Sequence, residues 1–383
     1  MTDGPILVLN AGSSSIKFAV FEADAALTER HSGLTAEIGT EGFLEIDGER
    51  RALPLPDHAT ALAAVLDALA ARGLPPAAFR AAAHRVVHGG AKLSQPVRVT
   101  PETLREIADC TPLAPLHNPH NLAAIEALRQ AAPDLPQTAS FDTAFHATMP
   151  EVAYRYAIPR TAETKGIRRY GFHGLSYASL VRRLPEVSGA PLPSRLLAFH
   201  LGNGASLCAI LNGRSVATTM GYSPLDGLTM GTRSGGIDAN AVLHLVDRHG
   251  AERARQILNS ESGLLGLSGG KSDMRRLILD PSADSAFAVE HFCYQSARHA
   301  GSLMAAMGGV DAIAFTGGIG ENAGAVRADV LRRLEWAGVR MDPDANHRRG
   351  PRLHGETSRV AIWIVPAEEE RMIALDAIGV LGS

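Results

Sequence analysis

The amino-acid sequence predicts an α/β protein that consists of two related domains. The chain has 383 residues, of which 45% are hydrophobic and 20% charged, so each of two domains can bury its own core. A pattern of apolar run, short polar turn and second apolar run occurs twice. Segments with helical periodicity alternate with short apolar runs of strand length. These observations favour duplicated α/β domains with mixed central sheets.

The repeated pattern occupies residues 5–21 and 196–211, and each copy predicts a hairpin of two strands. Aligning Gly12 with Gly202 gives an offset of 190 residues, under which the second apolar runs also coincide. The same unit in both halves of the chain indicates a duplicated domain.

The remaining elements follow from local patterns. Residues 59–72 predict a helix, which a Gly-Leu-Pro-Pro break separates from a strand at 80–87. Residues 312–315 predict a buried strand that ends in a Gly-rich turn at 317–322, and the Pro-rich stretch 185–193 predicts a loop.

The domain boundary is expected between about residues 142 and 195, where no composition shift fixes it. The last predicted helix, 367–380, could pack on either domain.

Bulk properties exclude several classes of protein. The formal net charge of −3 gives no basic excess for nucleic acid or an anionic membrane surface. Cys110, Cys208 and Cys293 are odd in number and form no CxxC pair, which argues against a disulfide framework and a Cys-based zinc site. We see no signal peptide and no apolar run of membrane-spanning length. A cytoplasmic protein is expected.

Two short motifs suggest other enzymes but lack the required context. Residues 266–270 fit GxSxG, yet no convincing strand precedes them, so a hydrolase is disfavoured. Residues 270–272 read Gly-Lys-Ser, but the spacing from Gly266 is one residue too short for a P-loop.

Three Gly-rich turns follow predicted strands, at residues 10–15, 200–204 and 317–322. Glycine lets backbone N–H groups approach phosphate oxygens, and serine adds hydroxyl donors. One such turn is weak support, because most only connect strands. Three of them, two in duplicated units, favour a nucleotide in a cleft between the domains. Lys17 lies within plausible reach of a phosphate, although alone it reads as a solvated lysine.

Five polar residues stand in apolar or rigid surroundings: Arg85 in a predicted buried strand, His117 in a stiff turn, Asp142 and His173 at predicted strand ends, and Arg233 in a glycine turn. Each alone is more often structural. Together they supply the cations and the carboxylate that an anionic substrate and a transferring phosphoryl group require.

These segments resemble the acetate kinases, the acetokinase branch of the actin-like sugar-kinase superfamily. The resemblance runs nearly end to end, through LVLNAGSSSIKF, HRVVHGG, LAPLHNP, FDTAFH, YGFHG, HLGNGAS, GTRSGGID, SDMR and GGIGEN. It implies duplicated actin-like (ribonuclease H-like) domains with a nucleotide cleft between them. The first would comprise residues 1–142 and a C-terminal helix at about 371–383, and the second, nucleotide-binding, residues 143–370.

The resemblance also implies roles for individual residues. Asn10 and Glu369 would serve Mg²⁺ (or Mn²⁺), although Glu368, Glu369 and Glu370 in sequence leave open which glutamate acts. The residues implied at ATP or ADP are Ser13, Ser15, Lys17, His200, Leu201, Gly202, Asn203, Gly204, Asp273, Met274, Arg275, Gly318, Ile319, Gly320, Glu321 and Asn322. Lys271, beside this set, departs from the family pattern and could alter nucleotide contacts.

For the reaction itself, Asp142, His173, Arg233 and His117 take the implied catalytic positions, and Arg85 would bind the substrate carboxylate. The implied methyl pocket consists of Val87, Leu116, Phe172 and Pro224, which is the acetate-like set. Because one methylene is worth only about 1–3 kcal/mol, propionate should be a weak substrate and not an excluded one.

Acetate is already ionised at pH 7, since a carboxyl group has a pKa of about 4–5. The nucleophile therefore needs no general base, and the cations should matter more than proton transfer. Asp142 would then orient Arg85 or a magnesium-bound water.

Alternatives are a propionate kinase, less plausibly a butyrate kinase, or an actin-like ATP-binding protein without kinase activity. The resemblance suggests a homodimer, with the apolar segment 286–307 as one possible interface. The sequence leaves the physiological direction, towards acetyl phosphate or towards ATP, open.

Overall fold

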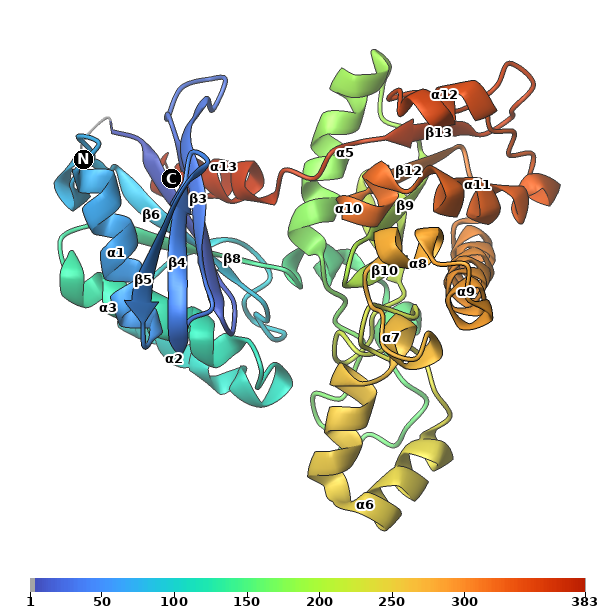
Figure 1. Cartoon of the computed structure of the whole chain (residues 1–383), viewed down its shortest axis with the longest axis horizontal. Helices are drawn as coiled ribbons and strands as arrows, with labels where there is room; N and C mark the ends of the chain where they lie inside the picture. The colour runs from blue at the N-terminus through green and yellow to red at the C-terminus, as the bar shows by residue number, and fades with distance from the viewer. Residues whose placement is uncertain (1–3, 383) are drawn as a thin grey trace. The chain divides into compact units, whose positions relative to one another are not determined.

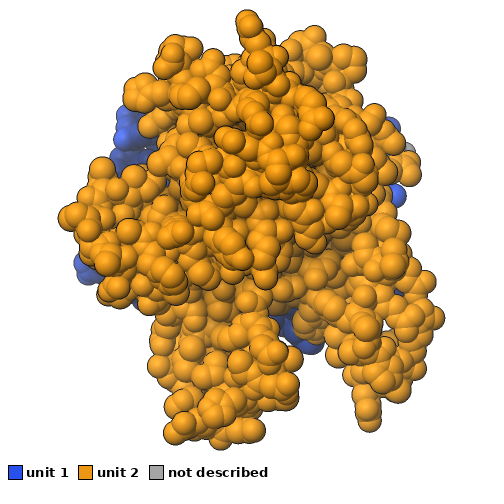
Figure 2. All heavy atoms as spheres, turned by 90° about the vertical axis from the view of Figure 1, so that its right-hand side faces the viewer, with its two compact units in different colours: residues 1–144, 368–383 blue, residues 145–367 orange. Residues whose placement is uncertain are grey.

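The computed structural model describes residues 4–382 and contains two compact units, coloured separately in Figure 2. Unit 1 is the span Met1–Ala144 with Glu368–Ser383, and unit 2 is Phe145–Ala367. Across the residues that the structure describes, no helix combines the length and the hydrophobicity needed to cross a membrane.

Unit 1 contains a mixed sheet with the strand order β5-β4-β3-β2-β1-β6-β8-β7 (Figure 1). The strands are β1 (Ile6–Ala11), β2 (Ser15–Phe21), β3 (Glu29–Ala36), β4 (Thr40–Ile46), β5 (Glu49–Leu55), β6 (Ala81–Val86), β7 (Val97–Arg98) and β8 (Gln137–Phe141). The first five strands pair antiparallel, whereas β6 lies parallel to both β1 and β8.

Helices cover both faces of this sheet. In β1, Leu7 and Leu9 pack into the core cluster that includes α1 (His58–Ala70) and α3 (Asn118–Ala131). Because side chains alternate along a strand, Ile6 and Val8 face the other side, where α13 (Glu369–Gly382) contacts β1, β6 and β8. The last helix therefore packs on unit 1. The unit also contains α2 (Pro101–Asp109) and 3₁₀ turns at Pro76–Ala78 and Thr111–Leu113.

Unit 2 contains a sheet with the order β11-β10-β9-β12-β13, made of β9 (Arg195–Leu201), β10 (Ala205–Leu211), β11 (Arg214–Thr218), β12 (Ala312–Thr316) and β13 (Ala361–Ile364). Helix α5 (Gly174–Ser188) packs on β9 and β12, and α9 (Ala283–Met307) contacts β9, β10 and β11. The other elements are α4 (Glu151–Tyr154), α6 (Ala239–Ser260), α7 (Gly263–Leu267), α8 (Met274–Leu279), α10 (Gly317–Asn322), α11 (Gly324–Arg332), α12 (Pro343–Arg348), and 3₁₀ turns at Ala144–Thr148 and Glu335–Ala337.

The predicted duplication is confirmed by strand order and direction. Strands β3-β2-β1-β6-β8 of unit 1 correspond to β11-β10-β9-β12-β13 of unit 2. In both sets the first two pairings are antiparallel and the last two parallel. Both predicted hairpins form, and the predicted α/β fold with mixed sheets is therefore confirmed.

Three local predictions are wrong. Residues 317–322 form the helix α10 and not a turn, because the Glu321 carboxylate accepts the N–H of Gly317 at 2.9 Å and closes a helical turn after β12. Residues 185–188 belong to α5, which continues through Pro185 because its apolar face packs on the sheet. The helix ends at Gly189, which has a left-handed conformation.

The third correction concerns His173, which does not stand at a strand end. It is the residue before α5, with φ 59° and ψ 24° in the left-handed region. A non-glycine residue in this conformation is uncommon and is often found at a functional site.

Candidate functional site

In unit 1, three polar side chains meet where β1, β6 and β8 end. The guanidinium group of Arg85 donates from Nε to Asp142 Oδ1 at 3.1 Å and pairs through Nη2 with the other carboxylate oxygen. Its Nη1 donates to Asn10 Oδ1 at 3.0 Å. Parallel β6 and β8 bring Arg85 and Asp142 to the same sheet edge, so the predicted substrate arginine and catalytic aspartate form one bidentate pair.

The electrostatics of this pair follow from its burial. Asp142 is 2% exposed. Burial alone would lower the pKa of Arg85, but the Asp142 carboxylate outweighs it and raises the pKa above its usual value. A guanidinium has five N–H donors, and these contacts use three of them, which leaves two for an anionic ligand.

The three successive glutamates at the start of α13 have different partners. Glu370 forms an ion pair with Lys17, with 2.6 Å between Oε1 and Nζ, and Glu368 pairs with Arg371 at 2.8 Å. Burial raises the pKa of the Glu369 carboxyl to about 7, and the nearby Asp142 adds to this shift against the opposing effect of Arg85. Glu369 and Glu370 both act electrostatically on Arg85, but Glu370 is ion-paired with Lys17.

The segment after β6 is held by side chains that the sequence analysis missed. The ladder between β1 and β6 ends at Leu9 and His84. Beyond it, buried Asn121 accepts the N–H of Val87 at 3.1 Å and donates to the carbonyl of Ala11 at 2.7 Å. One amide side chain therefore links the predicted methyl-pocket residue to the first phosphate turn. The signal was available in the spacing Asn118 and Asn121, one helical turn apart on α3.

Other predicted residues of unit 1 surround this edge. His117 is the residue before α3, and Leu116 beside it is 60% exposed. Ser13 is exposed and Ser15 half-buried in the turn between β1 and β2. The ring of His58, which was not predicted, donates to the carbonyl of Gly12 at 2.7 Å and steadies that turn.

In unit 2, His173 and Arg233 converge on the turn between β9 and β10. A Cβ atom at Gly204 would lie 3.3 Å from His173 Nε2 and 3.7 Å from Arg233 Nη1. The loop that carries Arg233 packs on this turn, because the N–H of Gly231 donates to the carbonyl of Asn203 at 2.9 Å. The structure therefore brings the imidazole of His173 and the guanidinium of Arg233 to the turn that the sequence analysis expects to contact phosphates.

The two predicted pocket residues of this unit each accept a hydrogen bond through their main-chain carbonyl, Pro224 from Arg233 and Phe172 from His146. The carbonyl of Pro224 accepts from Arg233 Nη1 at 3.2 Å. Phe172 is 2% exposed, and its carbonyl accepts from Nε2 of the buried His146 at 2.9 Å. Val87 and Leu116, the other two, belong to unit 1.

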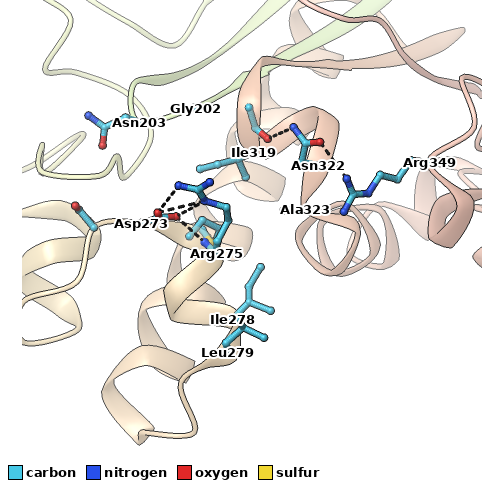
Figure 3. Close-up of a pocket in the computed structure, with 13 residues that line it drawn as sticks. Gly202, Asn203, Asp273, Arg275, Ile278, Leu279, Ile319, Asn322, Ala323 and Arg349 are labelled. Atoms are coloured by element: carbon cyan, nitrogen blue, oxygen red, sulfur yellow. Dashed lines mark hydrogen bonds and ion pairs between the residues drawn. The ribbon is translucent and has the colours of Figure 1, made fainter. Parts of the chain in front are cut away.

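A cavity of about 850 Å³ in unit 2 is lined by three of the predicted nucleotide segments (Figure 3). It lies among the β9–β10 turn, α8 and α10. The predicted residues that line it are Gly202, Asn203, Asp273, Met274, Arg275, Gly318, Ile319 and Asn322. Its volume is in the range of ligand pockets.

Charged and apolar groups both line the cavity. Hydrogen bonds from Arg275 lower the pKa of Asp273 to about 2, so this carboxylate is ionised. Arg349 Nη1 donates to Asn322 Oδ1 at 3.3 Å, and Ile278 and Leu279 add apolar surface (Figure 3). The sequence analysis missed the last two and Arg349. Leu279 is 83% exposed on the short helix α8, a feature that only the structure shows.

Other predicted nucleotide residues lie outside the cavity lining. The Glu321 carboxylate caps α10 and also accepts the N–H of Ala367 at 3.0 Å, and Gly320 is buried. His200 stacks on His173 with 4.0 Å between ring centroids. Lys271 pairs with Asp280 at 2.9 Å, which gives this unusual cation a structural partner.

Comparison with known proteins agrees with this arrangement. The model of the Acetokinase family matches residues 5–375. An acetate kinase of Rhodopseudomonas palustris (strain ATCC BAA-98 / CGA009) is 46% identical, and the alignment covers 96% of each chain. The crystal structure of Porphyromonas gingivalis acetate kinase aligns with a TM-score of 0.90 at 36% identity, over 99% of this chain and 100% of that one. A propionate kinase from Francisella tularensis subsp. tularensis SCHU S4 aligns with a TM-score of 0.92 at 35% identity, over 97% and 98%. The chain therefore belongs to the acetokinase family.

Proposed function

We propose that this enzyme reversibly transfers the γ-phosphoryl group of ATP to acetate, giving acetyl phosphate and ADP. The observation that carries the proposal is the Arg85 group, which Asp142 and Asn10 fix while two of its N–H donors remain for a carboxylate. An acceptor that is itself an anion needs such a cation, since it must approach a charged phosphate. Relatives named acetate kinase support the same substrate.

The nucleotide would bind in the unit 2 cavity, with its phosphates towards the β9–β10 turn. There His173 and Arg233 would neutralise the charge that spreads over the phosphoryl oxygens in the transition state. Ser13, Ser15 and Lys17 of unit 1 would contact phosphates as well, and His117 would lie near the phosphoryl group.

We assign Asp142 an orienting role. The acetate carboxylate has no proton to give at neutral pH, whereas the Arg85 fork needs an acceptor with matching geometry to fix its plane. The bidentate contact between these residues supports this role.

The residues implied for Mg²⁺ fit a hydrated ion. In the described part of the chain, no three His, Cys, Asp or Glu side chains group as a metal cage. Magnesium commonly uses only one or two carboxylates, with phosphate oxygens and water as further ligands. Glu369, whose pKa is raised chiefly by burial, would supply one protein ligand. The second would be the lone pair of Asn10 Oδ1 that does not accept from Arg85. The ion would offset phosphate charge.

Propionate is the second candidate acceptor, because a structural relative is named propionate kinase. Val87 is 5% exposed and β-branched, which favours the smaller acid. We expect Val87→Ala to raise kcat/KM for propionate relative to acetate by about 10-fold, roughly the worth of one methylene. An unchanged ratio would remove the basis for the pocket assignment.

The direct test traps acetyl phosphate as its hydroxamate from ATP, Mg²⁺ and acetate. Product should form with wild type and fall strongly with Arg85→Lys, while Arg72→Lys, a surface change in the same unit, should behave as wild type. Absence of product from wild type with acetate and with propionate would contradict the proposal and favour a non-catalytic ATP-binding protein.

We further propose a cytoplasmic homodimer. Most apolar residues of the expected interface at 286–307 pack inside unit 2, among them Phe292 and Met304, so only exposed side chains such as Phe287 and Tyr294 could contribute. Sedimentation would measure the assembly.

A further inference from the structure

We infer that Tyr177 and Ser206 form a directional hydrogen-bond relay that holds His173 in the neutral form with its proton on Nε2. The inference rests on the proposed role of His173 at the phosphoryl group and deepens it. Tyr177 and Ser206 are positioning residues, since they act on the phosphoryl group only through the imidazole.

The relay is a chain of three side chains from three elements. His173, before α5, has its Nδ1 2.9 Å from Ser206 Oγ on β10. The same Oγ lies 2.6 Å from the hydroxyl of Tyr177, on the first turns of α5. Ser206 and Tyr177 are both 0% exposed, so water does not compete for these bonds. The imidazole is thus anchored on a buried polar path.

The proton order in this chain follows from counting donors. Ser206 has one proton and two lone pairs, so it can receive from Tyr177 and donate to Nδ1, do the reverse, or accept from both. The last order would leave the Ser206 proton without an acceptor, since within residues 4–382 its hydroxyl meets only these two groups. In the reverse order the Tyr177 proton needs another acceptor. The second polar group at this hydroxyl is the backbone N–H of His200, which is itself a donor. Across residues 4–382, the Tyr177 hydroxyl bonds to no acceptor but Ser206.

The reverse order would therefore leave a buried hydroxyl proton unsatisfied, which is costly. The favoured order runs from Tyr177 through Ser206 to Nδ1. Burial raises the pKa of Tyr177 well above its usual value, in agreement with a protonated donor, although Ser206 and the His200 amide oppose the shift.

An imidazole that accepts at Nδ1 is neutral and carries its proton on Nε2. Nε2 lies beside Gly204, with Arg233 Nη1 near the same point. The groups that face His173 include the stacked ring of His200, Arg233, Ser206 and, through Ser206, Tyr177. His173 would thus donate Nε2–H to a phosphoryl oxygen and transfer no proton.

The experiment compares Tyr177→Phe, Ser206→Ala and the double variant in the full chain. Tyr177→Phe should lower kcat about 10-fold with KM for ATP and acetate within about twofold, because binding is kept and only the imidazole is released. The double variant should be no worse than Ser206→Ala, since the relay passes through that serine. ¹⁵N spectra of the histidine side chains should show the Nε2–H form in wild type and a mixture in Tyr177→Phe.

Two references make the outcome decisive. Tyr170→Phe removes a hydroxyl that donates to the carbonyl of Gly166 at 2.9 Å and should behave as wild type. His173→Asn assigns the ¹⁵N signals and tests the proposed role of the histidine. If His173→Asn loses activity while Tyr177→Phe keeps wild-type kcat and tautomer, or if the two relay variants have additive effects, the relay is wrong. Full activity of His173→Asn would instead overturn the role proposed for His173.

Discussion

The two units repeat one sheet but end its strands differently. The ladder pairs Leu9 with His84 in unit 1 and Phe199 with Phe315 in unit 2, at equivalent places. One residue further along, unit 1 has Arg85 where unit 2 has Thr316. The sheets are therefore superimposable in register up to the point where the ligand chemistry begins.

The next strand shows the same divergence. His84 lies opposite Ala139, and Phe315 lies opposite Ile364. Three residues beyond these partners stand Asp142 in unit 1 and Ala367 in unit 2. The charged pair that we assign to the carboxylate thus corresponds to Thr and Ala in unit 2, where β12 continues directly into α10. The two units therefore share the sheet, and they differ in the side chains that follow the ends of its strands.

Replacing the fork of Arg85 should give the largest effect. Arg85→Lys keeps the charge but cannot form the bidentate contact with Asp142. We expect kcat/KM for acetate to fall about 100-fold, equivalent to about 2.7 kcal/mol, with KM for ATP nearly unchanged. If KM for ATP rose as much as kcat/KM for acetate fell, the assignment of Arg85 to acetate alone would be wrong.

Unit 2 also buries an arginine, but without a carboxylate. Arg327 is 0% exposed and donates to the carbonyls of Gly320 and Glu321 at 2.8 and 2.9 Å, and to Asn346 Oδ1 at 2.9 Å. Burial lowers its pKa to about 10, with a further contribution from Arg349. This arginine therefore fixes the end of α10, which lines the unit 2 cavity.

Arg327→Met should free those carbonyls and cost about 2 kcal/mol of stability. KM for ATP should rise several-fold while KM for acetate stays constant, in contrast to Arg85→Lys. Thermal unfolding and initial rates would measure both, with exposed Arg332→Met as the control on the same helix. If KM for ATP did not change, Arg327 would have no role in the proposed nucleotide site.

Much of this comparison could be predicted from sequence, because it depends on local patterns. The hairpins, the buried strand that carries Arg85 and the glycine turns are visible as apolar periodicity and punctuation. The link from Asn121 to Val87 and Ala11 depends on a helix packed across two strands, which one sequence does not reveal. The cavity residue Arg349 lies 27 positions from its partner Asn322, and no periodicity relates them.

The wrong predictions have a common cause. Residues 317–322 read as a turn because glycine has low helix propensity, yet the Glu321 side chain closes the helix. Pro185 reads as a breaker, yet packing on the sheet carries the helix through it. In both cases an added interaction outweighed the preference of single residues: a side-chain hydrogen bond within the helix at Gly317, and packing on the sheet at Pro185.

A smaller effect should follow from Gly204→Ala. The backbone of Gly204 does not have positive φ, so alanine is sterically possible for the main chain. Its Cβ would lie 3.3 Å from His173 Nε2 and 3.7 Å from Arg233 Nη1, tight enough to displace the imidazole by a few tenths of an ångström. We expect kcat to fall about 10-fold, since small misplacements of transition-state donors are costly. Gly379→Ala is the control, because its added Cβ would meet no atom within 4 Å. Equal activity of the two variants would contradict the close approach of His173 and Arg233 to Gly204.

The smallest effect concerns the free energy of unfolding at acidic pH, which we expect to change through His84 in unit 1 and not in unit 2. His84 is 2% exposed, and burial lowers its pKa to about 4, against about 6.5 unfolded. The unfolded chain therefore takes up the proton first, so the contribution of His84 is complete above pH 6.5 and is lost as the pH falls towards 4. At pH 5.5 the loss is about 1.4 kcal/mol.

Asp376 opposes this trend, because burial raises its pKa to about 6 and its folded form is favoured by acid. Wild type should consequently show little net change, and the test is the difference between variants. Relative to wild type, the stability of His84→Gln should be about 1.2 kcal/mol more favourable at pH 5.5 than at pH 7, measured by hydrogen exchange of β6 and β8 peptides. Peptides of unit 2 should not respond, and exposed His249→Gln should leave both units as they are. If β9 and β12 peptides showed the same change in stability with pH, the two units would unfold together and the effect of His84 would not be confined to unit 1.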